Sequence, residues 1–189
     1  MVSLTTTVSQ RIRGARRSTI AAVLAGVVLA AVAVSVLTSG ASGGTAERAA
    51  QPFSLARLGS PAAQVALAQD TGRPVIVNFF ASWCTACRAE TPLLARFYRA
   101  HHGRVLIIGV DSNDHDSAAA LRFLREHGVT YPVGYDPSAS VAVAYGVQAL
   151  PQTFFLNAGH QIVRHVTGAV TRAELTAWAA GLPGEGGAG

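Results

Sequence analysis

Cysteine is the residue whose type and spacing point most directly to chemistry in this chain of 189 residues. The sequence holds two cysteines, Cys84 and Cys87, within the run NFFASWCTACRAETP (78–92). A disulfide between them would close a very small loop. Such a bridge adds little stability, because disulfide stabilisation grows with the length of the loop that is closed. The spacing therefore favours a redox pair over a structural staple.

Metal binding is the weaker interpretation of the pair. A structural zinc site takes four ligands, and two cysteines supply only half of them. The acidic segment DSNDHD (111–116) contains His115 and could bind a cation, but a solvated connection with a helix cap is more typical of such a run. The sequence therefore predicts no metal site, and a copper carrier using two thiolates and a histidine remains the alternative from another functional class.

In disulfide exchange the two cysteines would play different parts. A thiolate at Cys84 would attack a substrate disulfide, and Cys87, one helical turn further on, would resolve the mixed disulfide. The first turn of a helix stabilises a thiolate, because its N–H groups are unpaired and the helix dipole is positive there. We expect Trp83 to shield the pair. The Cys84–Cys87 disulfide is then the redox group, and no cofactor is expected.

A buried strand and a helix must position the cysteines. The run PVIVNFFA (74–81) is almost continuously apolar, as in a strand covered on both faces, and an apolar stripe predicts a helix over 85–101. Further strands are predicted at 104–111, 131–136, 153–157 and 161–168, and further helices at 62–69, 116–127, 136–146 and 171–182. After the helix at 62–69 the order is β-α-β-α-β-α-β-β-α, which predicts an α/β sandwich with a mixed sheet.

The N-terminal part of the chain has a different character. Four arginines in the first seventeen residues explain most of the net charge of +5, since eleven arginines and ten acids make up the rest. That balance does not indicate a nucleic-acid partner. Residues 20–37 are apolar and long enough for a membrane-spanning helix, with a cleaved signal peptide as the alternative. The positive-inside rule then places residues 1–19 in the cytoplasm and everything after Leu37 outside.

The remaining boundaries follow from composition. Residues 38–51 are small and polar and predict a flexible linker. Residues 52–182 are enough for one domain, and the Gly-rich tail 183–189 is expected to be disordered.

Three sequence features together resemble the thioredoxin-like family: VNFFASWCTAC (77–87), Pro92, and YGVQALPQTFFLN (145–157). The most similar group is that of the membrane-anchored TlpA/ResA/DsbE thiol–disulfide oxidoreductases, the cytochrome c biogenesis type. This resemblance covers about 52–182. It implies a thioredoxin-like three-layer sandwich with a mixed central sheet, preceded by one N-terminal transmembrane helix. Two features depart from the group: the Thr-Ala pair between the cysteines, and the helix-like 62–69 where a short hairpin is usual.

The resemblance also implies roles for two prolines. Pro151 matches the family's cis-proline, which lies beside the CxxC motif and leaves the backbone of Leu150 free to pair with an extended substrate. An ordinary loop proline is the alternative. Pro92 would kink the active-site helix, with or without a catalytic consequence.

Two further polar residues concern the proton of the second cysteine. Ordinary thioredoxins carry a buried aspartate where this chain has Asn78, and an asparagine cannot ionise. Glu90, three residues after Cys87 and at a position shared with the TlpA/ResA/DsbE group, is the candidate that takes the proton instead. A surface glutamate paired with arginines is an equally weighted alternative.

The sequence thus predicts an extracytoplasmic protein-disulfide oxidoreductase acting on protein thiols and disulfides. The resemblance implies a reductant of selected exported proteins such as apocytochrome c, recharged by a membrane electron donor. An oxidant of exported proteins remains the alternative, because electron flow depends on a potential that local electrostatics set. We expect a monomer held at the bacterial cell membrane by a single pass, or secreted if residues 20–37 are cleaved.

Overall fold

The computed structural model describes residues 48–70, 72–101 and 103–182. The predictions for residues 1–19, 20–37 and 183–189, and most of the predicted linker 38–51, lie outside these residues. Within the described ranges, no helix combines the length and the apolar character needed to cross a membrane.

In this part of the chain, eight strands form one mixed sheet. The strands β4, β5 and β6 run parallel, whereas β7 pairs antiparallel with both β4 and β8. Across the sheet the order is β1-β8-β7-β4-β5-β6-β2-β3. Their bounds are Arg48–Ala49 (β1), Ser54–Arg57 (β2), Ser60–Ala66 (β3), Val75–Phe80 (β4), Leu106–Ser112 (β5), Val133–Asp136 (β6), Gln152–Leu156 (β7) and Gln161–Thr167 (β8).

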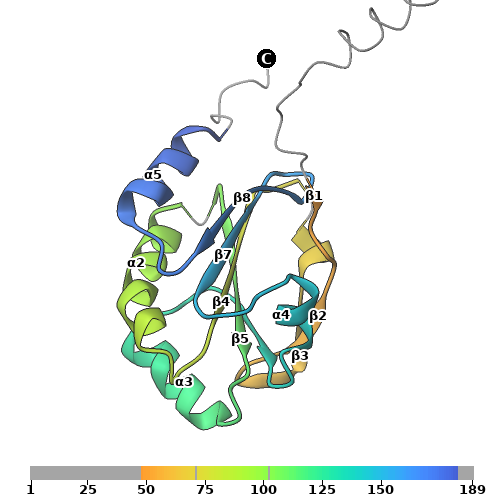
Figure 1. Cartoon of the computed structure of the whole chain (residues 1–189), viewed down its shortest axis with the longest axis vertical. Coiled ribbons are helices and arrows are strands. Elements are labelled where there is room, and N and C mark those ends of the chain that lie inside the picture. Colours follow the sequence, from red (N-terminus) through yellow and green to blue (C-terminus); the bar gives the residue numbers. More distant parts are fainter. Residues whose placement is uncertain (1–47, 71, 102, 183–189) are drawn as a thin grey trace, which may run out of the picture. The chain divides into compact units, whose positions relative to one another are not determined.

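Helices cover both faces of this sheet (Figure 1). The helices α2 (Thr85–His101), α3 (Ser117–Glu126) and α5 (Arg172–Ala180) pack on one face, and the short α4 (Ser140–Ala144) packs on the other. Side chains of β4 alternate between the two apolar clusters: Ile76 and Phe80 lie under α2, and Val77 lies on the α4 side. The mixed three-layer sandwich is therefore confirmed.

The predicted helix at 62–69 is wrong. This stretch contributes most of β3 and a short 3-10 helix, η1 (Leu67–Asp70). Its strand pairs antiparallel with β2 in the register Leu55↔Val65, across a turn in which Gly59 has a φ of +81°. Alanine favours a helix in isolation, but pairing with a neighbouring strand decides the local structure. The hairpin usual in the resembling group is thus present here.

The predicted start of the helix after residue 136 is also wrong. Asp136 ends β6, and α4 begins at Ser140 after a left-handed Ala139. The carboxylate of Asp136 nevertheless caps this helix, because it accepts the N–H groups of Val141 and Ala142 at 3.1 Å each. The other caps are as predicted: Asp116 accepts an N–H of α3, and Thr171 forms a capping box in α5.

Candidate active site

The loop between β4 and α2 carries the two cysteines. A disulfide links Cys84, which immediately precedes α2, to Cys87 in its first turn. Cys84 is 6% exposed, whereas Cys87 is fully buried. The backbone N–H of Cys87 donates to the Cys84 sulfur at 3.1 Å. In the reduced protein that N–H would favour a thiolate at Cys84, the more exposed of the two cysteines.

The residues ahead of Cys84 are fixed by the loop that follows β5. The Ser82 N–H donates to a carboxylate oxygen of Asp114 at 2.8 Å. The Trp83 indole N–H donates to the carbonyl of Asn113 at 3.0 Å, although 59% of this side chain is exposed. These bonds position the loop, while the predicted shielding by Trp83 stays a prediction.

Glu90 lies in the interior, on α2 three residues after Cys87. It is 2% exposed and its carboxylate accepts two hydrogen bonds at 2.8 Å, from Asn78 Nδ2 and from the Val170 N–H. The alternative of a surface glutamate paired with arginines is therefore wrong. Burial raises the pKa of Glu90 from 4.5 to about 7, although the bonds from Val170 and Asn78 act in the opposite direction. A carboxyl with this pKa can both accept and release a proton near neutral pH.

Asn78 joins Glu90 to the β7 side of the site. Its amide nitrogen also donates to Thr153 Oγ1 at 2.9 Å, so one buried amide holds side chains from α2 and β7 together. Thr153 has no special pattern in the sequence. Its only signal is its place on β7, directly opposite Asn78 on β4.

Pro151 lies at the same end of the sheet as the cysteines. Gln152 pairs with Phe79 near the end of β4, and Pro151 directly precedes it. The Leu150–Pro151 peptide bond is cis, as the resemblance implied. The Pro151 carbonyl accepts the Gly168 N–H at 2.9 Å, two residues before Val170. One segment after β8 thus contacts both the proline loop and Glu90, whereas substrate pairing by the half-buried Leu150 stays a prediction.

Pro92 lies inside α2, as predicted. Because proline has no N–H, it cannot donate the usual helical bond to the carbonyl of Arg88. One residue earlier, the Thr91 hydroxyl donates to the carbonyl of Cys87 at 2.7 Å. Whether Pro92 kinks the helix stays a prediction.

The acidic segment 111–116 is only partly the solvated connection that its composition suggested. Asn113, His115 and Asp116, the cap of α3, are exposed as expected, whereas Asp111 is fully buried and Asp114 is 2% exposed. The described residues include no group of three or more histidine, cysteine, aspartate or glutamate side chains arranged to hold a metal ion.

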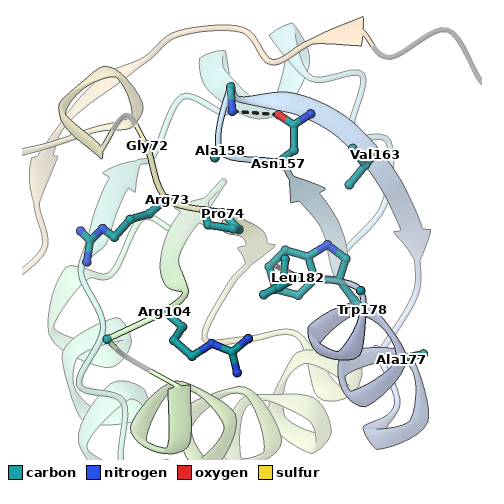
Figure 2. A pocket seen from close by; sticks show the side chains of 13 residues that line it. Gly72, Arg73, Pro74, Arg104, Asn157, Ala158, Val163, Ala177, Trp178 and Leu182 are labelled. Atoms are coloured by element: carbon teal, nitrogen blue, oxygen red, sulfur yellow. Dashed lines mark hydrogen bonds between the residues drawn. The ribbon is translucent and has the colours of Figure 1, made fainter. Parts of the chain in front are cut away.

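A cavity of about 770 Å³ lies at the opposite end of β4 (Figure 2). It is lined by Pro74, which precedes β4, and by Trp178 and Leu182 among others. The cysteines follow the other end of β4, so this cavity plays no part in chemistry at the sulfur atoms.

This arrangement can transfer two electrons. A nearly buried disulfide sits at the start of a helix, and Cys84 keeps 6% of its surface exposed whereas Cys87 keeps none. A titratable carboxyl lies one helical turn beyond the inner sulfur, on the same side of α2.

Comparison with known proteins bears directly on this site. The Redoxin family model matches residues 45–177. Among curated relatives, the thiol:disulfide interchange protein DsbE homolog of Paracoccus denitrificans is 39% identical over 53% of this chain and 54% of its own length. The thiol-disulfide oxidoreductase ResA of Bacillus subtilis is 32% identical over 59% of this chain and 63% of its own length. The chain thus spans between half and two thirds of these relatives.

A solved structure shows the same fold. The DsbF homologue of Corynebacterium diphtheriae superimposes with a TM-score of 0.65 at 25% identity, covering 71% of this chain and 86% of that one. The thioredoxin-like α/β architecture that the sequence predicted is therefore confirmed.

Proposed function

Because this chain belongs to the redoxin family, we propose that it is a thiol–disulfide oxidoreductase in which Cys84 attacks and Cys87 resolves. The observation that carries the proposal is the disulfide between Cys84, slightly exposed just before α2, and Cys87, fully buried within its first turn. The names of the relatives from P. denitrificans and B. subtilis support the same chemistry.

The proposed reaction begins with the reduced protein. The Cys84 thiolate attacks a disulfide of the partner, one partner sulfur leaves as a thiolate, and a mixed disulfide forms. Cys87 then gives up its proton, for which Glu90 is the proposed acceptor, and attacks the Cys84 sulfur. The partner leaves with two thiols, and the protein retains the two-electron oxidised Cys84–Cys87 disulfide. A thiol donor must reduce that disulfide before the next cycle.

The finer proposal is a reductant of selected exported proteins such as apocytochrome c. It rests on the resemblance to the TlpA/ResA/DsbE group and on relatives named DsbE and ResA. We further propose that residues 20–37 anchor the chain in the membrane, with the catalytic domain outside and the electron donor in the membrane. The apolar run and the arginines before it support this placement.

Two measurements test the proposal. In the full chain, Cys87→Ser should accumulate a mixed disulfide with a protein substrate, because the resolving thiol is absent, whereas Cys84→Ser should form none. Equal trapping by both variants would contradict the assigned order of attack. A reduction potential near or below thioredoxin's value of about −270 mV supports a reductant, and one near DsbA's value of about −120 mV would make the protein an oxidant.

A further inference from the structure

Asp111 is a buried carboxyl at the active-site end of the sheet, and it has no role in the exchange reaction proposed above. Asp111, near the end of β5, is fully buried, and neither of its carboxyl oxygens accepts a hydrogen bond from any of the described residues. A buried, ionised carboxylate without a partner is very costly, and such a group takes up a proton instead. Asp111 therefore needs an explanation that involves a proton.

The neighbour that explains it is Asp114. Both oxygens of Asp114 already accept backbone N–H groups, one from Ser82 at 2.8 Å and one from Asp116 at 3.2 Å. Two carboxylates offer only acceptors, so neither can bond to the other unless one of them carries a proton. Asp111 has no such N–H donors, and their absence favours its neutral form. The proton of the pair therefore belongs to Asp111.

The charges around Asp111 agree with this assignment. The pKa of Asp111 is raised from 3.8 to about 8, and burial is the largest cause. The charge of Asp114, a side-chain hydrogen bond with Asp114, and the charge of Asp136 follow in that order. Tyr135 on β6 faces the same acids, and its own pKa is raised by burial and then by Asp111 and Asp114. None of the groups that shift the pKa of Asp111 is a cation. The nearby guanidinium of Arg88 is bonded to the Ser82 carbonyl at 2.9 Å.

Asp114 connects this acid pair to the reacting sulfur. Ser82, which donates to Asp114, is two residues before Cys84, and the Trp83 indole is bonded to Asn113 next to Asp114. The loop that places the attacking sulfur is thus held by the segment after β5. Anything that moves Asp114 moves Ser82, and with it the approach of Cys84 to a partner disulfide.

We propose that Asp111 is a positioning residue for disulfide exchange: its proton bridges to Asp114, which keeps the Ser82–Cys84 loop in place. This inference rests on the proposed exchange function of Cys84. Loss of the proton places two negative carboxylates side by side in the interior, and their repulsion displaces Asp114 from the Ser82 N–H. Exchange by the wild-type protein should therefore weaken at alkaline pH.

The test compares the full chain with Asp111→Asn. The amide has nearly the same shape, donates permanently to Asp114 and cannot ionise, so it imitates the protonated acid at every pH. The rate of insulin-disulfide reduction is measured from pH 6 to 9 for both proteins. The wild-type rate is divided by the variant rate at each pH. This ratio removes the pH dependence that ionisation of Cys84 gives to both proteins. The ratio should be constant below pH 7 and fall by up to about tenfold at pH 9, one unit above the pKa of about 8.

Asp116→Asn is the matched control, because it neutralises an exposed acid of the same segment and asparagine also caps helices well. The ratio of the wild-type rate to the Asp116→Asn rate should stay constant from pH 6 to 9. A wild-type to Asp111→Asn ratio that stays flat from pH 6 to 9 would overturn the proposal.

A second measurement does not depend on activity or on the folding of Asp111→Asn. Infrared absorption of a neutral carboxyl is followed in the Glu90→Gln chain, where Glu90 no longer contributes. A neutral carboxyl at pH 7 that ionises near pH 8 supports the acid pair, and its absence at pH 7 overturns it. If the wild type reduces no disulfide at pH 7, the exchange function fails, while the infrared result still decides the state of Asp111.

Discussion

Replacing Glu90 by glutamine tests the proposed proton acceptor, and the structure predicts both a kinetic and a thermodynamic result. In the unfolded chain this carboxyl ionises near 4.5, and in the folded protein near 7. Between these values the folded state keeps a proton that the unfolded state has released. The folded state of the wild type therefore loses stability as the pH rises through this window and loses no more above it.

The size of this cost follows from the shift. A difference of 2.5 between pKa values of 4.5 and about 7 corresponds to roughly 3 kcal/mol at pH 8, since one unit is worth about 1.4 kcal/mol. Glutamine does not ionise, so it avoids this loss of stability, but it has only one carbonyl oxygen to accept the two hydrogen bonds that the carboxylate accepts. Its NH₂ group must face either Asn78 Nδ2 or the Val170 N–H, which costs about 1–3 kcal/mol. We expect Glu90→Gln to be less stable than the wild type at pH 4.5 and close to it at pH 8.

The kinetic result concerns the resolving step. If Glu90 accepts the proton of Cys87, its loss should slow resolution of the mixed disulfide by about a hundredfold or more, the usual range for a general base. The wild-type rate should rise through pH 7 as Glu90 ionises, and this inflection should be absent from the variant. Glu126→Gln is the matched control, because Glu126 is an exposed glutamate of α3 that pairs with Arg88 of α2.

Urea unfolding at pH 4.5 and 8 and single-turnover exchange from pH 5 to 9 measure the two effects. The reasoning is refuted if Glu90→Gln keeps the inflection near pH 7 and exchanges within threefold of the wild type. A variant that loses rate equally at every pH would show a structural role without proton transfer.

Two other substitutions test the surroundings of the site. Thr153→Val should cost about 1–2 kcal/mol in urea unfolding, because the buried Asn78 amide loses one of its two acceptors; Thr153→Ser, which keeps the hydroxyl, is the control and should cost less. Gly109→Ala should cost about 1–3 kcal/mol, because its methyl would lie 3.1 Å from the Phe80 ring and 3.2 Å from that of Tyr131; an unchanged unfolding midpoint would show that these rings move aside freely.

The sequence was sufficient for the β4–α2 unit because each of its signals is local. The continuous apolar run over 74–81 predicts a strand covered on both faces, and all six residues of β4 are buried. The cysteines then fall at the start of a helix whose apolar stripe is visible in the sequence. The burial of Glu90 could not be decided in this way, because it depends on Val170, eighty residues further along the chain.

Two errors show where local signals fail. The run 62–69 is rich in alanine, and only its pairing with β2 makes it a strand; Gly59 in the turn between the two strands was the available signal. The segment 111–116 looked solvated because of its charge. The available signal for Asp111 was its place as the last residue of the strand predicted at 104–111, whose apolar run indicates burial on both faces, and every residue of β5 is buried.

The β2–β3 hairpin affects where a partner protein can bind to the sheet. It lies beside β6, so the parallel part of the sheet does not end in an open edge. The outermost strand, β3, begins with Ser60 and Pro61, and proline cannot donate a bond to a further strand. An unfolded partner chain is therefore discouraged from extending the sheet on this side. Under the proposed function, recognition is left to the loop at Leu150 and Pro151, which holds a partner's backbone at the sulfur that reacts with it.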